Sequence, residues 1–256
     1  MISSLENPRV KELLRLRKAR ERRRSGLFVA EGPREVERAR AAGLTIVATY
    51  YAPELVEWGH GGDEVSERVL RKMAYRAEPE GVLAVVEAPR RELPRDGSLY
   101  LVAVGIEKPG NLGAMARSAD AAGADALVVA EAAADPWNPN AIRASTGAVF
   151  TLPVVEATLE DVTALDADLV AAVVGAPTRY TDADLARRVV IAVGSEDVGL
   201  DLRWAAAADI QVAIPVHGAT ADSLNASAAA AVLLFEAVRQ RGRGDRSTSS
   251  PRAGGD

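Results

Sequence analysis

Short apolar runs alternate along this chain with segments whose apolar residues recur at helical spacing. A run of apolar residues bounded by glycine or proline predicts a buried strand. Strands are expected at 27–30, 44–51, 82–86, 99–106, 126–130, 169–174, 189–193 and 210–214. Helices are expected at 5–24, 34–42, 113–122, 141–146 and from about 223 to 239. This alternation predicts an α/β protein with a mostly parallel sheet covered on both faces.

Two changes in composition divide the chain into parts. Residues 88–97 are rich in proline and charge, and the segment from 242 onward holds glycine, serine and arginine with almost no apolar side chain. We therefore expect a smaller N-terminal α/β domain at 1–90, a linker at 91–98, a second α/β domain at 99–241 and a disordered tail at 242–256. The 256 residues suffice for two domains of the usual size, about 100–150 residues each.

The composition excludes several classes of protein. The chain has no cysteine, which rules out disulfides, thiolate zinc sites and a cysteine nucleophile. The N-terminal segment lacks the apolar core of a signal peptide, and no apolar run reaches the about 20 residues of a membrane span. We therefore expect a soluble, cytoplasmic protein with no membrane partner and no bound metal.

Charge is distributed unevenly. Residues 1–97 carry a net charge of +3 and the remaining residues −8, which together give the overall −5. Nine lysines and arginines lie between Arg9 and Arg24. A polyanion such as RNA would therefore meet the N-terminal part first, although such a run is most often only the solvated face of a helix.

The first of three polar loops is KPGNLGAMAR at 108–117, which follows a predicted strand and opens a helix. Its glycines permit close approach of the backbone, and a helix start offers N–H groups to an anion. The functional interpretation places Asn111 and Arg117 together at the mouth of the sheet. Taken alone, the segment is better explained as a tight turn with Arg117 on the solvated surface. Because it lacks the G-x-G-x-x-G spacing, it argues against NAD.

The other two polar loops also follow predicted strands. The second is VGSEDVGL at 193–200, and the third is IPVHG at 214–218, with SLNAS at 223–227 opening the last helix. Each has a sufficient structural explanation of its own. Ser195 is suited to capping a turn, and Ser223 is a good helix N-cap.

Taken together, the three loops resemble the signature motifs of the SpoU, or TrmH-like, RNA ribose methyltransferases of the SPOUT superfamily. The matching segments are NLGAMAR, VGSEDVGL, and IPV followed by SLNAS, in the order and at the spacing of that family. The N-terminal segments NPRVK and FVAEGPR, with the basic run between them, resemble the substrate-binding domain that many of these enzymes carry. The resemblance covers about residues 1–241. Relatives often have Met at the position of Val216 and Val at that of Ala226, and neither exchange is expected to inactivate the protein.

This resemblance implies a SPOUT fold, in which the C-terminal part of the parallel sheet threads into a trefoil knot. It also implies a homodimer and S-adenosyl-L-methionine bound in the knotted loops. The cofactor-binding positions it implies are Val174, Gly175, Gly194, Ile214, Leu224 and Asn225. The positions it implies around the reacting centre are Asn111, Arg117, Glu196, Ser223 and Asn225.

The implied reaction is methyl transfer to a ribose 2′-hydroxyl of RNA, with ribosomal RNA as the expected substrate. A hydroxyl is a poor nucleophile, so the protein must align the reacting atoms and help to remove a proton. Arg117 is expected to stabilise the developing alkoxide, because an arginine stays charged. Glu196 is expected to orient Arg117, to accept the proton or to cap its own loop. His60 and His217 are expected to be surface residues.

Three other functions remain open. The chain could act on transfer RNA, methylate a base on the same fold, or serve as a non-catalytic RNA-binding factor. The complete motif set argues against a base methyltransferase. The presence of Asn111, Arg117 and Asn225 argues against a degenerate, non-catalytic pocket.

Overall fold

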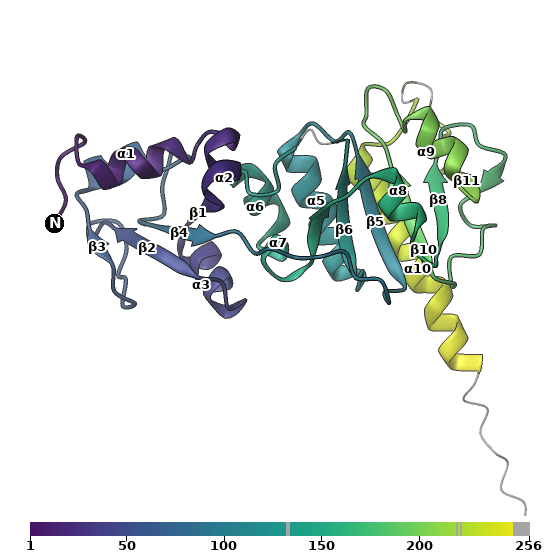
Figure 1. Cartoon of the computed structure of the whole chain (residues 1–256), viewed down its shortest axis with the longest axis horizontal. Coiled ribbons are helices and arrows are strands. Elements are labelled where there is room, and N and C mark those ends of the chain that lie inside the picture. The colour runs from purple at the N-terminus through teal and green to yellow at the C-terminus, as the bar shows by residue number, and fades with distance from the viewer. Residues whose placement is uncertain (132–133, 219, 221, 248–256) are drawn as a thin grey trace, which may run out of the picture.

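Two β-sheets, one in each half of the chain, organise the fold, and the molecule is elongated along the line that joins them (Figure 1). The computed structural model describes residues 1–131, 134–218, 220 and 222–247. The expected tail therefore lies outside the described residues from 248 onward.

The N-terminal sheet has the strand order β1-β4-β2-β3 and carries helices on both faces. β4 pairs antiparallel with β1 and β2, while β3 pairs parallel with β2. Its strands are β1 (Leu27–Glu31), β2 (Ile46–Tyr51), β3 (Asp63–Glu64) and β4 (Val82–Glu87). Its helices are α1 (Pro8–Arg15), α2 (Ala19–Ser25), α3 (Pro33–Ala41) and α4 (Glu67–Met73). Apolar residues of α1 and α4 pack on one face and those of α3 on the other.

The single helix predicted at 5–24 is wrong, because the chain turns between α1 and α2. Lys18 is in an extended conformation there. The guanidinium of Arg22 donates to the carbonyl oxygens of Leu16 at 2.7 Å and Arg17 at 3.0 Å, which satisfies backbone acceptors at the turn. Arg17 in turn donates to the Lys72 carbonyl at 2.9 Å. Contacts with distant segments thus outweigh the helical propensity of the basic run.

The C-terminal sheet has seven strands in the order β7-β6-β5-β10-β8-β11-β9, and every neighbouring pair is parallel. The strands are β5 (Leu99–Val104), β6 (Ala126–Ala130), β7 (Val154–Glu156), β8 (Asp168–Ala172), β9 (Thr178–Arg179), β10 (Val189–Val193) and β11 (Ile210–Ala213). This parallel sheet beside a smaller α/β unit confirms the predicted fold class. Threading of the chain into a knot stays a prediction.

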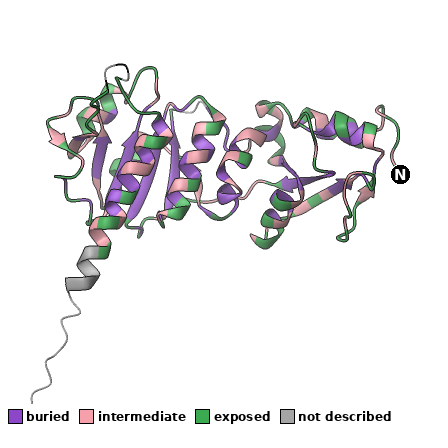
Figure 2. Cartoon of the chain, turned by 180° about the vertical axis from the view of Figure 1, so that it is seen from behind, coloured by how far each residue is buried: buried purple, intermediate pink, exposed green. Residues whose placement is uncertain are grey.

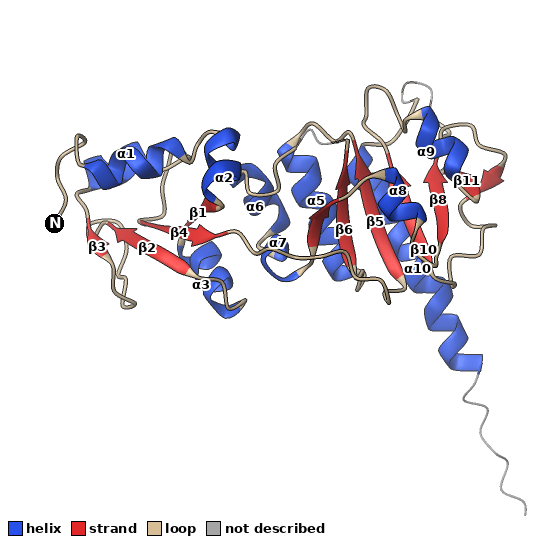
Figure 3. Cartoon of the chain, viewed as in Figure 1, coloured by secondary structure: helices blue, strands red, loops and turns tan. Residues whose placement is uncertain are grey.

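Helices cover both faces of the larger sheet, with their buried sides toward the strands (Figures 2 and 3). They are α5 (Pro109–Ala121), α6 (Pro139–Ser145), α7 (Ala148–Thr151), α8 (Leu159–Thr163), α9 (Leu202–Ala207) and α10 (Ala226–Ser247). Residues of α5, α6, α7 and α10 share one apolar cluster, and α8 and α9 contribute to the other. Among the described residues, no helix combines the length and apolar character that crossing a membrane requires.

Two helix boundaries near the motifs differ from the prediction. α5 begins at Pro109, so most of segment 108–117 is helical and not a loop. Proline at the first helical position needs no hydrogen-bond partner for its nitrogen, which favours this early start. α10 begins at Ala226 because Asn225, and not Ser223, caps it. The Asn225 Oδ1 accepts the N–H groups of Ser227 at 3.0 Å and Ala228 at 3.3 Å.

The far end of α10 also differs from the prediction, since the helix continues to Ser247, whereas the tail was expected from 242. Extending an existing helix is easy because each added residue gains a backbone hydrogen bond. Arg241 anchors this part of the helix by donating to the carbonyls of Ser98 at 2.8 Å and Arg187 at 2.7 Å.

The two halves of the chain share one apolar core. The ring of Phe28 in β1 stacks on Trp137 and Phe150 of the C-terminal half, with centroids 4.8 and 5.7 Å apart. Residues 88–98, which connect the halves, contain no helix or strand. Arg91 in this segment donates to the Phe150 carbonyl at 2.5 Å. The connection is therefore fastened to the second half.

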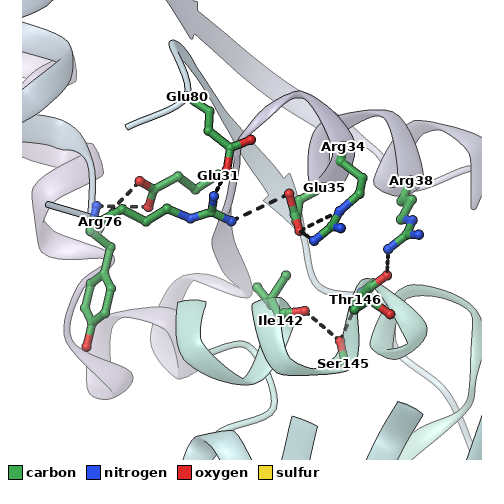
Figure 4. A network of polar contacts seen from close by, with 11 residues as sticks. Glu31, Arg34, Glu35, Arg38, Arg76, Glu80, Ile142, Ser145 and Thr146 are labelled. Atoms are coloured by element: carbon green, nitrogen blue, oxygen red, sulfur yellow. Dashed lines mark hydrogen bonds and ion pairs between the residues drawn. The ribbon is translucent and has the colours of Figure 1, made fainter. Parts of the chain in front are cut away.

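Charged side chains surround this junction (Figure 4). The buried carboxylate of Glu35 pairs with Arg34 at 2.9 Å and lies 3.7 Å from Arg76. Arg38 of the same helix donates to the Thr146 carbonyl between α6 and α7. Polar contacts across the junction thus accompany the shared apolar core.

Candidate active site

Four polar side chains from three separate segments meet at the carboxyl ends of β5 and β10. Lys108 Nζ lies 2.7 Å from Glu196 Oε2, and Asn111 Nδ2 donates to Glu196 Oε1 at 2.9 Å. Asn225 Nδ2 donates to the same Glu196 oxygen and lies 3.3 Å from Asn111 Oδ1. We call these four residues the carboxylate cluster.

The parallel sheet explains why these segments meet. β5 and β10 are hydrogen-bonded neighbours, so the segments that follow them emerge at the same edge. Lys108 precedes α5 and Asn111 lies in its first turn, while Glu196 belongs to the loop after β10. Asn225 reaches the cluster from the N-cap of α10, a helix that packs against α5. Three of the four side chains therefore lie at the start of a helix, and the fourth, Glu196, lies three residues after the end of β10.

The cluster holds Glu196 in its ionised form. The hydrogen bond from Lys108, followed by that from Asn111, lowers the pKa of Glu196 despite some desolvation. The same contact with Glu196 raises the pKa of Lys108. Three donors already point at its two oxygens, and a carboxylate stabilised in its charged form is a weaker proton acceptor than a free one. The geometry thus favours a positioning role for Glu196 over that of a general base.

A pocket of about 430 Å³ opens beside the carboxylate cluster. It lies at the carboxyl ends of β8, β10 and β11, the edge at which parallel sheets bind ligands. Four of the expected cofactor-binding residues line it, namely Val174, Gly194, Ile214 and Leu224. Ser223 also lines it, whereas Gly175 and Asn225 flank the lining residues.

Gly194 explains how the pocket keeps its shape. A Cβ atom at this position would lie less than 3.0 Å from the Gly199 carbonyl and from the Leu200 nitrogen. The loop closes on itself through a bridge between Ser195 and Gly199, and Gly199 has a φ of +75°. A left-handed residue at the turn and an absent side chain opposite it are both required for this fold of the loop.

Two family models match the chain. The SpoU rRNA methylase family matches residues 98–235, and the MRM3-like substrate-binding domain matches residues 7–84. The first match alone covers more than half of the 256 residues. The chain belongs to the SpoU rRNA methylase family. This confirms the family that the three motifs predict.

Relatives of this SpoU family member match it over most of their length. A 23S rRNA (uridine(2479)-2′-O)-methyltransferase of Streptomyces viridochromogenes is 32% identical, over 89% of this chain and 88% of the relative. The 23S rRNA (guanosine(2553)-2′-O)-methyltransferase RlmP of Bacillus subtilis is 31% identical, over 91% and 97%.

Solved structures agree with these relatives. An RNA 2′-O ribose methyltransferase has a TM-score of 0.82 and 42% identity, covering 94% of this chain and 98% of its own. An AdoMet-bound rRNA methyltransferase from Sinorhizobium meliloti has a TM-score of 0.83 and 31% identity, covering 93% and 97%. The similarity of this SpoU family member therefore extends over both halves of the chain.

Arg117 does not join the carboxylate cluster of its own chain. It is exposed on α5, and it makes no hydrogen bond or ion pair with the residues that the structure describes. Six helical positions separate it from Asn111, which turns the two side chains about 120° apart around the helix. Within one chain the structure thus shows no contact between Arg117 and Asn111, and their common orientation toward the mouth of the sheet stays a prediction. The side chains that orient Glu196 are Lys108, Asn111 and Asn225.

The two histidines lie on the surface, as expected. His60 Nε2 is 3.1 Å from Glu37 Oε1, and its ring contacts Trp58 edge-on, far in sequence from the motifs. His217 is exposed in the segment after β11. In the described part of the chain, no three His, Asp or Glu residues are grouped to hold a metal ion.

Lys108 is the member of the cluster that the sequence interpretation did not select. It stands directly before the proline that opens α5, and it is otherwise an exposed side chain. A lysine at the end of a buried strand and next to a motif asparagine is a weak signal. Only the folding of the 193–200 loop toward α5 gives it an acidic partner.

Proposed function

We propose that this chain transfers a methyl group from S-adenosyl-L-methionine to a ribose 2′-hydroxyl of ribosomal RNA. The observation that carries the proposal is the pocket at the carboxyl ends of β8, β10 and β11, which adjoins the carboxylate cluster. Its volume lies within the range of about 300–1,000 Å³ that small-molecule sites occupy.

The residues present fit this cofactor. Val174, Ile214 and Leu224 offer apolar surface, and the absence of a side chain at Gly194 leaves backbone groups at the pocket wall. Asp222 lines the same pocket and carries a charge suited to a cationic ligand. When bound, S-adenosyl-L-methionine supplies an electrophilic methyl group on a positively charged sulfur. Solved relatives with bound AdoMet, from Sinorhizobium meliloti and Streptomyces viridochromogenes, support this assignment.

The carboxylate cluster would hold the reacting segments in place. Glu196 ties the start of α5 to the start of α10, so Asn111 and Asn225 keep a fixed distance from the pocket. Arg117 is proposed to stabilise the negative charge that develops on the ribose oxygen. An exposed guanidinium is free to meet a phosphate or a ribose of the incoming RNA, as this role requires.

A homodimer is part of the proposal. Apolar side chains are unusually exposed near the pocket and on α10, with Val198 86%, Leu202 85% and Phe235 47% accessible. Exposed apolar surface of this kind is typical of protein interfaces. We expect a two-fold interface that uses α5 and α10. Because Arg117 is exposed on α5, this interface would bring it to the subunit boundary.

Capture of RNA is proposed for the segment that runs from the end of α1 through α2. Arg15, Lys18, Arg20 and Arg23 are exposed on this segment and would neutralise phosphates. Arg22 is excluded from this role because it is buried. Relatives that act on 23S rRNA favour ribosomal RNA over transfer RNA, and such a substrate would place the reaction in the cytoplasm.

The test is methylation of a 23S rRNA transcript with labelled S-adenosyl-L-methionine, followed by nucleoside analysis. The expected product is a 2′-O-methyl nucleoside at one position. A methylated base would indicate base methylation on this fold. Cofactor binding with methylation of transfer RNA alone would show that the substrate is transfer RNA and not ribosomal RNA. RNA binding with no cofactor binding would leave a non-catalytic factor.

A further inference from the structure

We infer that the buried ion pair between Arg22 and Asp135 is a clamp that holds the N-terminal unit in a fixed position against the methyltransferase unit, and thereby sets which ribose reaches the site. The catalytic part of this inference, the choice of the methylated ribose, rests on the proposed function. The clamp itself rests on geometry alone.

The contacts of Arg22 use all three of its guanidinium nitrogens. Nε and the second terminal nitrogen each lie 2.7 Å from Asp135 Oδ2. The first terminal nitrogen donates to the carbonyls of Leu16 and Arg17 in the turn between α1 and α2. The side chains are only 3% and 8% exposed. One buried arginine therefore ties the basic segment formed by the end of α1, the turn and α2 to the other half of the chain.

Asp135, the partner of Arg22, is also held in place by a second contact. Asp135 uses its second oxygen, Oδ1, to accept the backbone N–H of Trp137 at 2.8 Å, and the Trp137 ring stacks on Phe28 of β1. The polar pair and the aromatic stack thus connect the same short segment to α2 and to β1. A buried carboxylate without its arginine would be strongly unfavourable, so the two halves have one preferred arrangement.

The clamp lies on the same edge of the sheet as the site. Asp135 follows β6, the hydrogen-bonded neighbour of β5, and β5 leads directly to Lys108 and Asn111. The helix that begins after Trp137 is α6, which packs closely on α5. Gly113 makes this possible, because a Cβ there would lie under 3.0 Å from the Ala141 carbonyl. A displacement at the clamp is therefore transmitted through two packed helices to the segment that carries Asn111.

Exposed cations next to the clamp give it a functional consequence. Arg23 is the immediate neighbour of Arg22, but it points to solvent, and a groove of about 410 Å³ at the junction is lined by both arginines and by Trp137. RNA held by Arg23 and the other exposed cations would thus lie at a set distance from the pocket. The buried arginine would determine that distance without touching RNA.

The experiment compares Arg22→Met with Arg23→Met in the full-length protein, since both remove one positive charge from the same helix, α2. The first readout needs no RNA and measures hydrogen exchange of the β1 and α6 amides together with small-angle scattering. Arg22→Met should exchange faster and scatter as a more extended, mobile particle, whereas Arg23→Met should match the wild type. Equal behaviour of both variants would overturn the clamp.

Asp135→Asn provides an independent test if Arg22→Met fails to fold. The asparagine keeps an oxygen for the Trp137 N–H but loses the charge that pairs with Arg22. It should show the same faster exchange at β1 and α6. Wild-type exchange in a folded Asp135→Asn protein would overturn the clamp.

The second readout uses the 23S rRNA transcript and separates positioning from charge. Arg22→Met should lower kcat/KM by about 100-fold, the scale for a displacement of about 1 Å, and spread methylation to neighbouring riboses. Its salt dependence of RNA binding and its affinity for S-adenosylhomocysteine should stay unchanged. Arg23→Met should keep the single product and reduce the slope of log affinity against log salt by about 0.7–0.9.

Identical products and slopes for the two variants would overturn the positioning role. A wild-type protein that methylates no RNA would instead contradict the proposed function. The hydrogen-exchange measurement would still show whether the Arg22–Asp135 pair holds the two units together.

Discussion

The ammonium group of Lys108 lies 2.7 Å from Glu196 Oε2 and bridges the segments that follow two neighbouring parallel strands. On its other oxygen, Glu196 accepts the amides of Asn111 and Asn225. A carboxylate whose ionised form is stabilised by these donors therefore joins three segments at the wall of the proposed cofactor pocket.

Replacing Lys108 should make cofactor binding more sensitive to acid. The pKa of Glu196 is lowered in the fold, chiefly by Lys108, so the stabilisation from its charge is present above the ordinary value of 4.5 and is lost as pH falls through the lowered pKa. Asp197 and Glu107 act electrostatically on Lys108, and Asp222 lines the same pocket as Glu196. Lys108→Met should raise the pKa of Glu196.

The measurement is the affinity for S-adenosylhomocysteine by calorimetry between pH 7 and pH 4. Lys108→Met should lose affinity at a higher pH than the wild type, and Lys108→Arg should restore the profile. Arg187→Met, which removes a similarly exposed ion pair with Asp168, is the matched control and should leave the profile unchanged. Superimposable profiles for Lys108→Met and the wild type would show that Lys108 does not position Glu196.

Substitution of Arg117 should affect turnover and not cofactor affinity. If its guanidinium stabilises the developing alkoxide, the benefit appears only in the transition state. Arg117→Ala should then reduce the single-turnover rate by about 10²–10³-fold, the scale for one such donor. Arg117→Lys should also fail, because lysine lacks the planar fork. Arg68→Ala, at an exposed arginine on α4, is the control. A near-normal rate for Arg117→Ala would move the catalytic role to another residue.

A methyl group at Gly194 should abolish cofactor binding. Its Cβ would collide with the backbone at Gly199 and Leu200, and backbone atoms cannot move aside as a flexible side chain can. Gly194→Ala should therefore bind no S-adenosylhomocysteine in calorimetry while it stays folded by circular dichroism. Gly59→Ala is the control, since no atom lies within 4 Å of its added Cβ. Wild-type affinity in Gly194→Ala would mean that the loop binds in another conformation.

Reversal of exposed charges on α2 should weaken RNA binding. Arg20→Glu combined with Arg23→Glu should lower affinity and reduce the salt slope by about 0.7–0.9 for each phosphate that the variant no longer neutralises. Filter binding from low to high salt would measure both quantities. Arg40→Glu with Arg68→Glu makes the same change in net charge elsewhere on the N-terminal unit and should have less effect. Equal losses of RNA affinity in both double variants would show that the basic residues of α2 attract RNA only through net charge and make no specific phosphate contacts.

The protein should be a dimer in solution. Light scattering should give twice the chain mass of 27.0 kDa at micromolar concentration. Phe235→Glu should shift the distribution toward the monomer, because it places a charge on an exposed apolar residue of α10. Phe235→Leu should stay dimeric. A 27.0 kDa particle for the wild type across this range would refute the dimer.

The local sequence determined the longer strands, the order of the motifs and the family of this protein, but it did not reveal the two- and three-residue strands β3, β7 and β9. Strands such as 126–130 and 189–193 were predictable because every residue in them is buried, and such strands appear in a sequence as unbroken apolar runs. Glu196, Asn111 and Asn225 were also identified from their motifs. Short helices such as α7 and α9 were missed because fewer than two helical turns show no clear period.

Contacts between distant residues decided the rest. Arg22 looks like any other arginine of the basic run, and only Asp135, 113 positions away, makes it a buried residue. Lys108 acquires its role from Glu196, 88 positions away. Arg117 has a fixed place on α5, yet the face it presents depends on the packing of that helix. Sequence patterns report local periodicity and burial, whereas the partner of a charge is set by which segments the folded chain brings within a few ångströms of it.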